Sequence, residues 1–253
     1  MKVITITNQK GGVGKTTLAF HLVSLLAELN ERVLAIDMDP QGNFTSIFWP
    51  NGPVPATQHI KNIFTNMPPL PMRVKIGGVD EVDLVGSDIQ LSTYATEMKL
   101  DNYFALKSFV ESRSKDYSYV VIDTPPSLGL FTLASVIAAT HIVIPTDISM
   151  FSLLGIDDLL NTIRRVEQRM TFKPQVVGII VMGHQERIIA SQEIVNALRR
   201  KFGKFIIGTV PHSTRIREAV NFERVPVWRI NPDYKAAVIF KDVLIKLLKR
   251  IEL

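Results

Sequence analysis

The stretch VITITNQKGGVGKTT, residues 3–17, decides the fold of this chain. A β-branched run predicts a strand at Val3–Thr7, and a helical run, Leu18–Leu29, follows the glycines. Glycines allow backbone N–H groups to point into a loop as a concave anion nest, and the N-terminus of the next helix adds its positive end. We therefore expect a phosphate-binding loop that comprises Lys10, Gly11, Gly12, Val13, Gly14, Lys15, Thr16 and Thr17.

Two side chains of this loop carry its expected chemistry. Lys15 can reach the β- and γ-phosphates of a bound nucleotide, and the Thr16 hydroxyl can ligate Mg²⁺. The loop is a variant, because the usual spacing G-x-x-x-x-G-K-[ST] would place a glycine where this chain has Gln9. A second lysine, Lys10, stands directly before the glycines. The residues alone leave Lys10 as either a solvated loop lysine or a further cation for phosphate.

Acidic residues end two further predicted strands, Val33–Asp37 and Tyr119–Asp123. The carboxyl ends of neighbouring parallel strands converge on the ligand crevice of an α/β sheet, so both acids should lie beside the loop. Asp123 follows a run of apolar residues, which is the Walker-B pattern of an acid that holds Mg²⁺, most often through a water. Asp39, two residues after the first strand, is our candidate for orienting an attacking water. The alternative for each acid is to cap a turn before a proline.

Short apolar runs alternate with longer helical patterns along the rest of the chain. Several of these runs are apolar on both faces, which is typical of a parallel sheet covered by helices on both sides. We expect one α/β domain over residues 1–253, with a doubly wound, mostly parallel sheet and an irregular proline-rich excursion around residues 49–72. The remaining expected strands are Val82–Val85, Ile142–Pro145, Val176–Met182 and Phe205–Val210.

Composition excludes several classes of protein. The 253 residues are 46% apolar and 21% charged, an ordinary globular composition, and the absence of cysteine excludes thiol catalysis, disulfides and iron-sulfur clusters. The amino terminus carries no export pattern, and prolines interrupt the uncharged stretch at residues 124–146, so we expect no membrane span. Residues 151–253 hold 18 basic and 10 acidic side chains. Such a basic half raises the expectation of a polyanion partner.

The loop KGGVGKT at residues 10–16 resembles the loop of the deviant Walker ATPases, K-G-G-x-G-K-[ST]. Two further stretches resemble the ParA/Soj branch of that family: DMDPQGN at residues 37–43 and DTPPSLG at residues 123–129. The resemblance implies ATP and Mg²⁺ as cofactors. It also implies that the extra lysine crosses a dimer interface to the partner's ATP, that the second aspartate of D-x-D positions water, and that the first assists the metal shell. Carried onto this chain, the catalytic residues are Lys10, Lys15 and Asp39, and the metal residues are Thr16, Asp37 and Asp123.

The resemblance extends to residues 210–219, VPHSTRIREA, which are similar to the family segment I-P-R-N-V-R-L-x-E-A. By this resemblance, we expect Pro211 to contact the nucleotide. Members of the branch bind DNA without sequence preference as ATP dimers, through basic side chains that meet phosphates. The implied partners are therefore a second copy in the ATP state, nonspecific DNA and a ParB/Spo0J-like centromere-binding protein. Arg187 and Arg215 align with family positions for DNA contact, and the weaker candidates are Lys204, Arg217 and Arg224.

Two other functions share these motifs. A MinD-like membrane-associated ATPase ends in an amphipathic tail, and residues 235–253 combine an apolar stripe with basic neighbours. We favour a helix packed on the sheet, with Asn231 as N-cap and Pro232 at the first helical position. A cargo-positioning ATPase would differ only in its partner. The predicted function is ATP-dependent partition of a chromosome or plasmid by a cytoplasmic, nucleoid-associated ATPase that is slow until its partner stimulates it.

Overall fold

The computed structural model describes residues 1–50, 52–65, 67–77, 80–97, 99–170 and 173–252. Within these ranges, eight strands form one sheet in the order β3-β4-β2-β5-β1-β6-β7-β8, and all neighbours are parallel except β3 and β4. The predicted mostly parallel α/β sheet is confirmed. The strands are β1 (Lys2–Ile6), β2 (Val33–Asp37), β3 (Met72–Ile76), β4 (Asp80–Val85), β5 (Tyr119–Asp123), β6 (His141–Thr146), β7 (Gln175–His184) and β8 (Ile206–Pro211).

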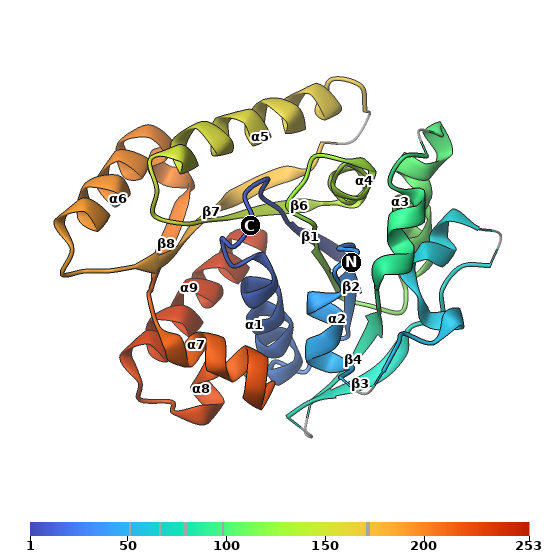
Figure 1. Ribbon diagram of the computed structural model, residues 1–253, viewed down its shortest axis with the longest axis horizontal. Helices are drawn as coiled ribbons and strands as arrows, with labels where there is room; N and C mark the ends of the chain where they lie inside the picture. The colour runs from blue at the N-terminus through green and yellow to red at the C-terminus, as the bar shows by residue number, and fades with distance from the viewer. Residues whose placement is uncertain (51, 66, 78–79, 98, 171–172, 253) are drawn as a thin grey trace.

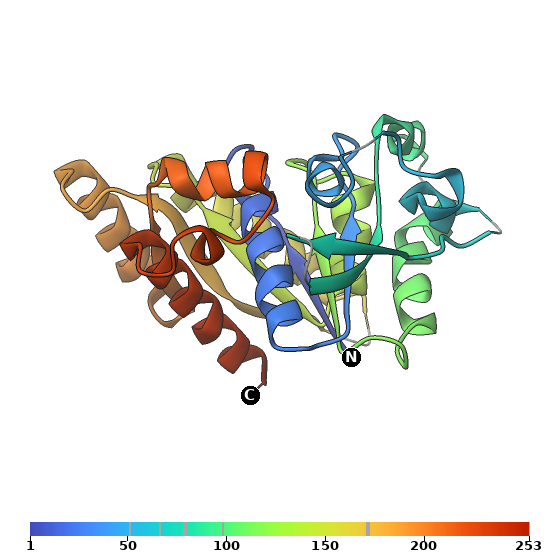
Figure 2. The same cartoon turned by 90° about the horizontal axis from the view of Figure 1, so that it is seen from below.

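Helices cover both faces of the sheet, as Figures 1 and 2 show. One face carries α1 (Lys15–Glu28), α2 (Asn43–Phe48), α7 (Thr214–Glu218), α8 (Val227–Ile230) and α9 (Lys235–Glu252), whose buried side chains share one apolar cluster. The other face carries α3 (Leu100–Ser112), α4 (Leu130–Ala138), α5 (Phe151–Glu167) and α6 (Ile189–Phe202). Each interior strand is therefore buried on both sides, which explains its nearly continuous apolar sequence.

Strand β3 was not predicted from the sequence. Its side chains alternate between buried and exposed along Met72–Ile76, and it lies at the edge of the sheet, antiparallel to β4. An antiparallel edge strand needs only one apolar face, so it lacks the continuous apolar run that marks the parallel strands. The available signal was its period-two alternation, with Arg73 and Lys75 directed outward.

The last helix begins later than the sequence predicts. Asn231 ends α8 instead of capping α9, and its side-chain oxygen accepts a hydrogen bond from the backbone N–H of Asp233 at 3.1 Å, within the turn that leads to Lys235. The expectation that this helix packs on the sheet is confirmed. Its apolar stripe is buried, comprising Ala237, Phe240, Leu244, Leu248 and Ile251. Across the described residues, no helix is both long and apolar enough to cross a membrane.

The described part of the proline-rich segment, residues 49–72, is tied to the end of β4. The backbone N–H of Ile60 donates to the carbonyl of Gly86 at 2.8 Å, and the buried ring of His59 contacts the carboxylate of Asp88 at 2.9 Å. Two short 3-10 helices, Ala56–Gln58 and Ile60–Phe64, shape this segment. Because Ile60 belongs to an apolar cluster of the core, the segment is packed as well as hydrogen-bonded.

Two polar side chains of α1 join it to the carboxy-terminal helices. Nε2 of the buried His21 ring accepts a hydrogen bond from the backbone N–H of Val227. The ring proton of the neutral imidazole therefore lies on Nδ1, which donates to the Thr17 carbonyl at 2.7 Å. Burial lowers the pKa of His21 to about 4, which keeps the ring neutral. Near the end of the same helix, Glu28 accepts hydrogen bonds from Trp228, Arg229 and Lys241 at 2.8, 3.0 and 3.0 Å.

We predict that Glu28→Ala lowers the free energy of unfolding by about 2 kcal/mol at neutral pH, because three donors lose a partly buried acceptor. Burial opposes ionisation of Glu28, but the bonds from Trp228 and Lys241 outweigh it and hold its pKa below the usual 4.5. The difference from wild type should therefore be full above about pH 4.5 and vanish as the pH falls through the folded pKa. Urea unfolding of both proteins at neutral and acidic pH measures this difference in the free energy of unfolding.

Glu31→Ala is the matched control, since Glu31 lies near the same helix end and makes no ion pair with the described residues. An equal loss of stability in both variants would contradict the role of Glu28.

Candidate functional site

The glycine loop connects β1 to α1 in the conformation that anion binding requires. Gly12 and Gly14 have φ values of 75° and 88°, in the left-handed region that favours glycine, and Gly14 is the N-cap of α1. A Cβ added at Gly14 would also lie 3.3 Å from the Met182 side chain. The backbone geometry thus explains why glycines occupy these two positions.

Lys15 lies mostly buried at the start of α1. Its ammonium donates a hydrogen bond to the carbonyl of Lys10 at 3.0 Å, so the side chain folds back over the loop. Burial lowers the pKa of Lys15, while the charges of Asp123 and Asp39 oppose that shift. A partly desolvated cation beside an N–H-rich loop gains strongly when an anion such as phosphate enters.

Thr16 and Asp123 meet at the carboxyl edge of the sheet. The Thr16 hydroxyl donates to Asp123 Oδ2 at 2.6 Å, whereas the buried Oδ1 has no hydrogen-bond partner among the described residues. Burial, reinforced by the charge of Asp37, raises the pKa of Asp123 well above its usual value. A hydroxyl oxygen and a carboxylate oxygen without a hydrogen-bond partner are oxygen ligands of the kind that Mg²⁺ prefers. These two residues therefore fit Mg²⁺. The described residues include no group of three His, Cys, Asp or Glu that could hold a metal unaided, so phosphate and water would complete the shell.

Asp37 is brought beside Asp123 by the pairing of β2 with β5. Its Oδ1 accepts from the backbone N–H of Asp39 at 2.9 Å, and its Oδ2 accepts from the N–H and hydroxyl of Thr45 at 2.8 and 2.7 Å. Burial raises the pKa of Asp37 to about 6, against the opposing effect of these hydrogen bonds. In this arrangement Asp37 fastens the turn after β2 to α2, a contact that the sequence did not predict.

Asp39 lies in that turn at the edge of the loop. Its Oδ1 accepts a hydrogen bond from the backbone N–H of Gln41 at 2.9 Å, and only 9% of the residue is exposed. The charge of Asp39 also acts on Lys15 and Asp123, which places the three groups in one electrostatic cluster. The structure therefore gathers the predicted metal and catalytic acids around the phosphate loop.

Lys10 is paired within its own chain. Its ammonium contacts the Asp147 carboxylate at 2.6 Å and the Ser149 hydroxyl at 2.8 Å, both in the loop after β6. The other oxygen of Asp147 accepts from the Ser152 hydroxyl at 2.6 Å. Burial would raise the pKa of Asp147, but the hydrogen bonds from Lys10 and Ser152 outweigh it and hold that pKa below its usual value. The pair is about one-third exposed, so another anion can compete for Lys10.

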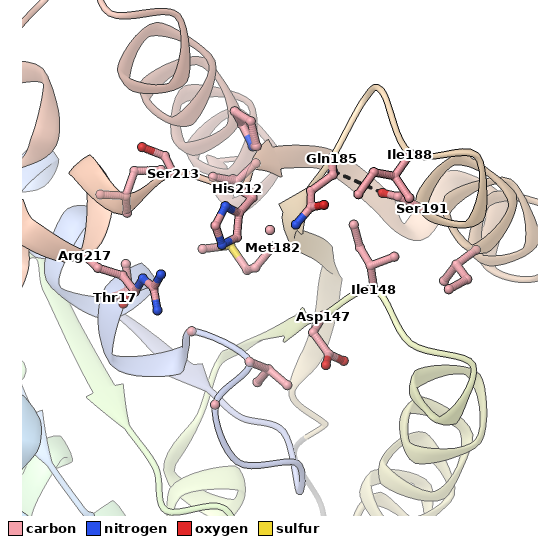
Figure 3. Close-up of a pocket in the computed structure, with 18 of the residues that line it drawn as sticks. Thr17, Asp147, Ile148, Met182, Gln185, Ile188, Ser191, His212, Ser213 and Arg217 are labelled. Atoms are coloured by element: carbon pink, nitrogen blue, oxygen red, sulfur yellow. Dashed lines mark hydrogen bonds between the residues drawn. The ribbon is translucent and has the colours of Figure 1, made fainter.

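A cleft of about 500 Å³ opens beside the loop (Figure 3). Thr17 lines one side, and Met182 of β7 with Gln185, which follows β7, lines the other. Pro211 at the end of β8 is also among the lining residues. Apolar walls with a few polar groups, at this volume, suit a nucleoside. The contact of Pro211 with a nucleotide stays a prediction.

The predicted DNA-contact arginines lie on different sides of this region. Arg187 is exposed in the turn between β7 and α6, and Arg215 is exposed on α7, where it pairs with Glu218 at 3.3 Å. Arg217, in contrast, lines the cleft, and Figure 3 shows its side chain on the side of Thr17. Its position suits contact with a nucleotide in the cleft.

Several residues around the site were not predicted from the sequence. Asp147 follows β6, and Met182, Gln185 and His212 lie at or after the ends of β7 and β8. No local motif marks Asp147, Met182 or Gln185, whereas His212 lies within residues 210–219, the segment similar to the family. The usable signal was their place after parallel strands, whose carboxyl ends form the crevice.

Comparison with known proteins identifies the family. A family described as an AAA domain matches residues 1–176. The chain is 31% identical over 245 residues to the sporulation initiation inhibitor protein Soj of Bacillus subtilis, covering 96% of each chain. It is 34% identical over 224 residues to the chromosome-partitioning ATPase Soj of Thermus thermophilus, covering 87% of this chain and 84% of the relative. The solved complex of a Cyanothece McdA variant with ATP shares the fold, with a TM-score of 0.86 at 23% identity over 98% of this chain and 96% of that one. On its motifs and these relatives, the chain belongs to the ParA/Soj family of partitioning ATPases.

Proposed function

We propose that this protein is an ATP-dependent DNA-partition ATPase that acts as a Mg-ATP dimer. The observation that carries the proposal is the phosphate loop with Lys15 buried beside it and the Thr16–Asp123 pair at its edge. Relatives named as chromosome-partitioning ATPases support the biological process. The McdA complex with ATP supports the choice of nucleotide.

In the proposed complex, the loop N–H groups and Lys15 hold the β- and γ-phosphates, and the adenosine occupies the cleft beside Pro211. Thr16 and Asp123 would hold Mg²⁺, while Asp37 keeps the neighbouring turn in place. The ion supplies charge neutralisation for the phosphates. Asp39 orients the attacking water, and phosphoryl transfer needs little other chemistry from the protein.

Dimer formation gives Lys10 its proposed role. In the dimer, Lys10 exchanges the Asp147 carboxylate for the phosphates of the ATP bound to the partner subunit. The exchange costs little because a one-third-exposed ion pair contributes only about 0.2–1 kcal/mol. The ATP dimer then binds nucleoid DNA without sequence preference, and a ParB-like partner accelerates hydrolysis and release. The burial of the apolar stripe of α9 argues against a membrane tail of the MinD kind.

Removing the charge of Asp147 should favour the dimer. We expect Asp147→Asn to lower the ATP-dependent dimer dissociation constant up to about thirtyfold, because Lys10 of each of the two subunits no longer has a competing carboxylate. Lys10→Ala should retain ATP binding but lose the dimer. Analytical ultracentrifugation with ATP measures both, with Asp158→Asn, an exposed acid on α5, as the control. A dimer of wild-type affinity in Lys10→Ala would remove the role of Lys10.

Asp39→Ala should bind ATP and slow its hydrolysis by about 10²-fold or more, since the attacking water loses its orienting group. Asp39→Asn retains an oxygen that can accept from the Gln41 N–H, so it separates catalysis from the turn contact. Both variants should be slow in single-turnover hydrolysis. Recovery of the wild-type rate in Asp39→Asn would assign Asp39 to the turn alone.

The function as a whole is tested by binding to nonspecific duplex DNA with ATP, ADP or no nucleotide. We expect binding with ATP only, weakened by salt and by Arg187→Ala, because the contacts are to phosphates. Lys15→Ala, which should not bind nucleotide, is the control and should ignore DNA in every condition. If the wild-type ATP dimer forms but does not bind DNA, the proposed role in DNA partition is wrong.

A further inference from the structure

Two basic runs that are distant in the sequence meet on the surface. Residues 164–169, RRVEQR, end α5 and continue beyond it, and residues 199–204, RRKFGK, end α6 and form the turn after it. Together they hold seven basic side chains and one acid. A groove of about 430 Å³ lies where the two runs approach each other, lined by Arg164 of the first run and by residues 200–204 of the second. We call it the α5–α6 groove.

Four cations line the α5–α6 groove: Arg164, Arg200, Lys201 and Lys204. The only acid on its lining, among the residues that the structure describes, is Asp157, which pairs with Lys201. Arg164 donates to the Asn161 side chain at 3.1 Å, a neutral partner. The side chains of Arg200 and Lys204 have no ion pair with any of the described residues. The groove therefore carries more positive charge than its own residues neutralise.

The shape of the groove is fixed by contacts that do not use these charges. Arg250 of α9 donates to the Lys204 carbonyl at 2.8 Å, which anchors the turn after α6. Phe202 is buried below that turn. Cations held close together on a fixed frame repel one another, and a groove focuses their field toward solvent. An anionic ligand relieves that repulsion, and a polymer of phosphates matches several cations in a row.

We propose that the α5–α6 groove binds the phosphate backbone of duplex DNA, as a contact separate from Arg187, Arg215 and Arg217. Of its four cations, only Lys204 is among the DNA-contact candidates from the sequence. This inference rests on the proposed function and names a surface for it. Arg187 precedes the first turn of α6 and Arg200 lies in its last turn. A helix of 14 residues is about 21 Å long, which corresponds to about six base pairs of DNA. One duplex can therefore lie along α6 and meet both ends.

The test compares the salt dependence of DNA binding in the full-length protein with ATP and Mg²⁺. The variant is Arg200→Ala with Lys204→Ala, two exposed side chains whose removal leaves the backbone contact of Lys204 intact. The control is Lys75→Ala with Lys99→Ala, which removes two exposed cations from the other half of the chain. Each phosphate contact contributes about 0.9 to the slope of log K against log salt.

We expect the groove variant to reduce the magnitude of that slope by about two and to bind DNA at least tenfold more weakly at low salt. Its melting temperature and its ATP-dependent dimerisation should equal those of wild type. The control should keep the wild-type slope. If the groove variant also keeps the wild-type slope, or if the slope of the control falls by as much as that of the groove variant, the groove proposal is wrong. The proposal of ATP-dependent DNA binding is then unaffected. If wild type ignores DNA in every nucleotide state, the proposed function fails and the groove proposal with it. Binding to anionic lipid vesicles without DNA binding would assign the cations to a membrane instead.

Discussion

The parallel pairing of β1 with β5 is the constraint on which the site depends. It aligns Ile6, the last residue of β1 before the phosphate loop, with Asp123, so the loop and the acid leave the sheet at the same edge. The hydrogen bond from Thr16 to Asp123 then closes the loop onto the sheet. A shift of one residue would turn Asp123 to the opposite face and separate these groups. The same register brings Asp123 close enough to Lys15 for their charges to interact, which offsets part of the cost of burying both groups.

The same edge holds two kinds of polar contact with different consequences. Asp37 is buried and accepts three hydrogen bonds, so it belongs to the rigid frame of the site. Lys10 and Asp147 are partly exposed, and their ion pair is weak enough to be exchanged for another anion. The proposed ATP dimer would use this division, with a frame that keeps its geometry and a cation that can change partners.

Helix α1 connects the phosphate loop to the basic half of the chain. His21 contacts the first turn of α1 through the Thr17 carbonyl and reaches the N–H of Val227 at the start of α8. Glu28 repeats the connection at the other end of the helix. Helix α9, which Glu28 holds through Lys241, also supplies Arg250 to the turn beside the α5–α6 groove. The nucleotide site and the basic surface are therefore joined through packed helices.

The sequence by itself determined the phosphate loop, the strand-end acids and the parallel character of the sheet. These are local patterns, because left-handed glycines, a lysine at a helix start and an acid after an apolar strand act within a few residues. The tertiary structure alone decided the pairing of Lys10 with Asp147, the hydrogen bonds that occupy Asp37, and the α5–α6 groove. Their members lie far apart in the chain or depend on side-chain direction. Strand order and helix packing set those relations, and no single stretch of sequence records them.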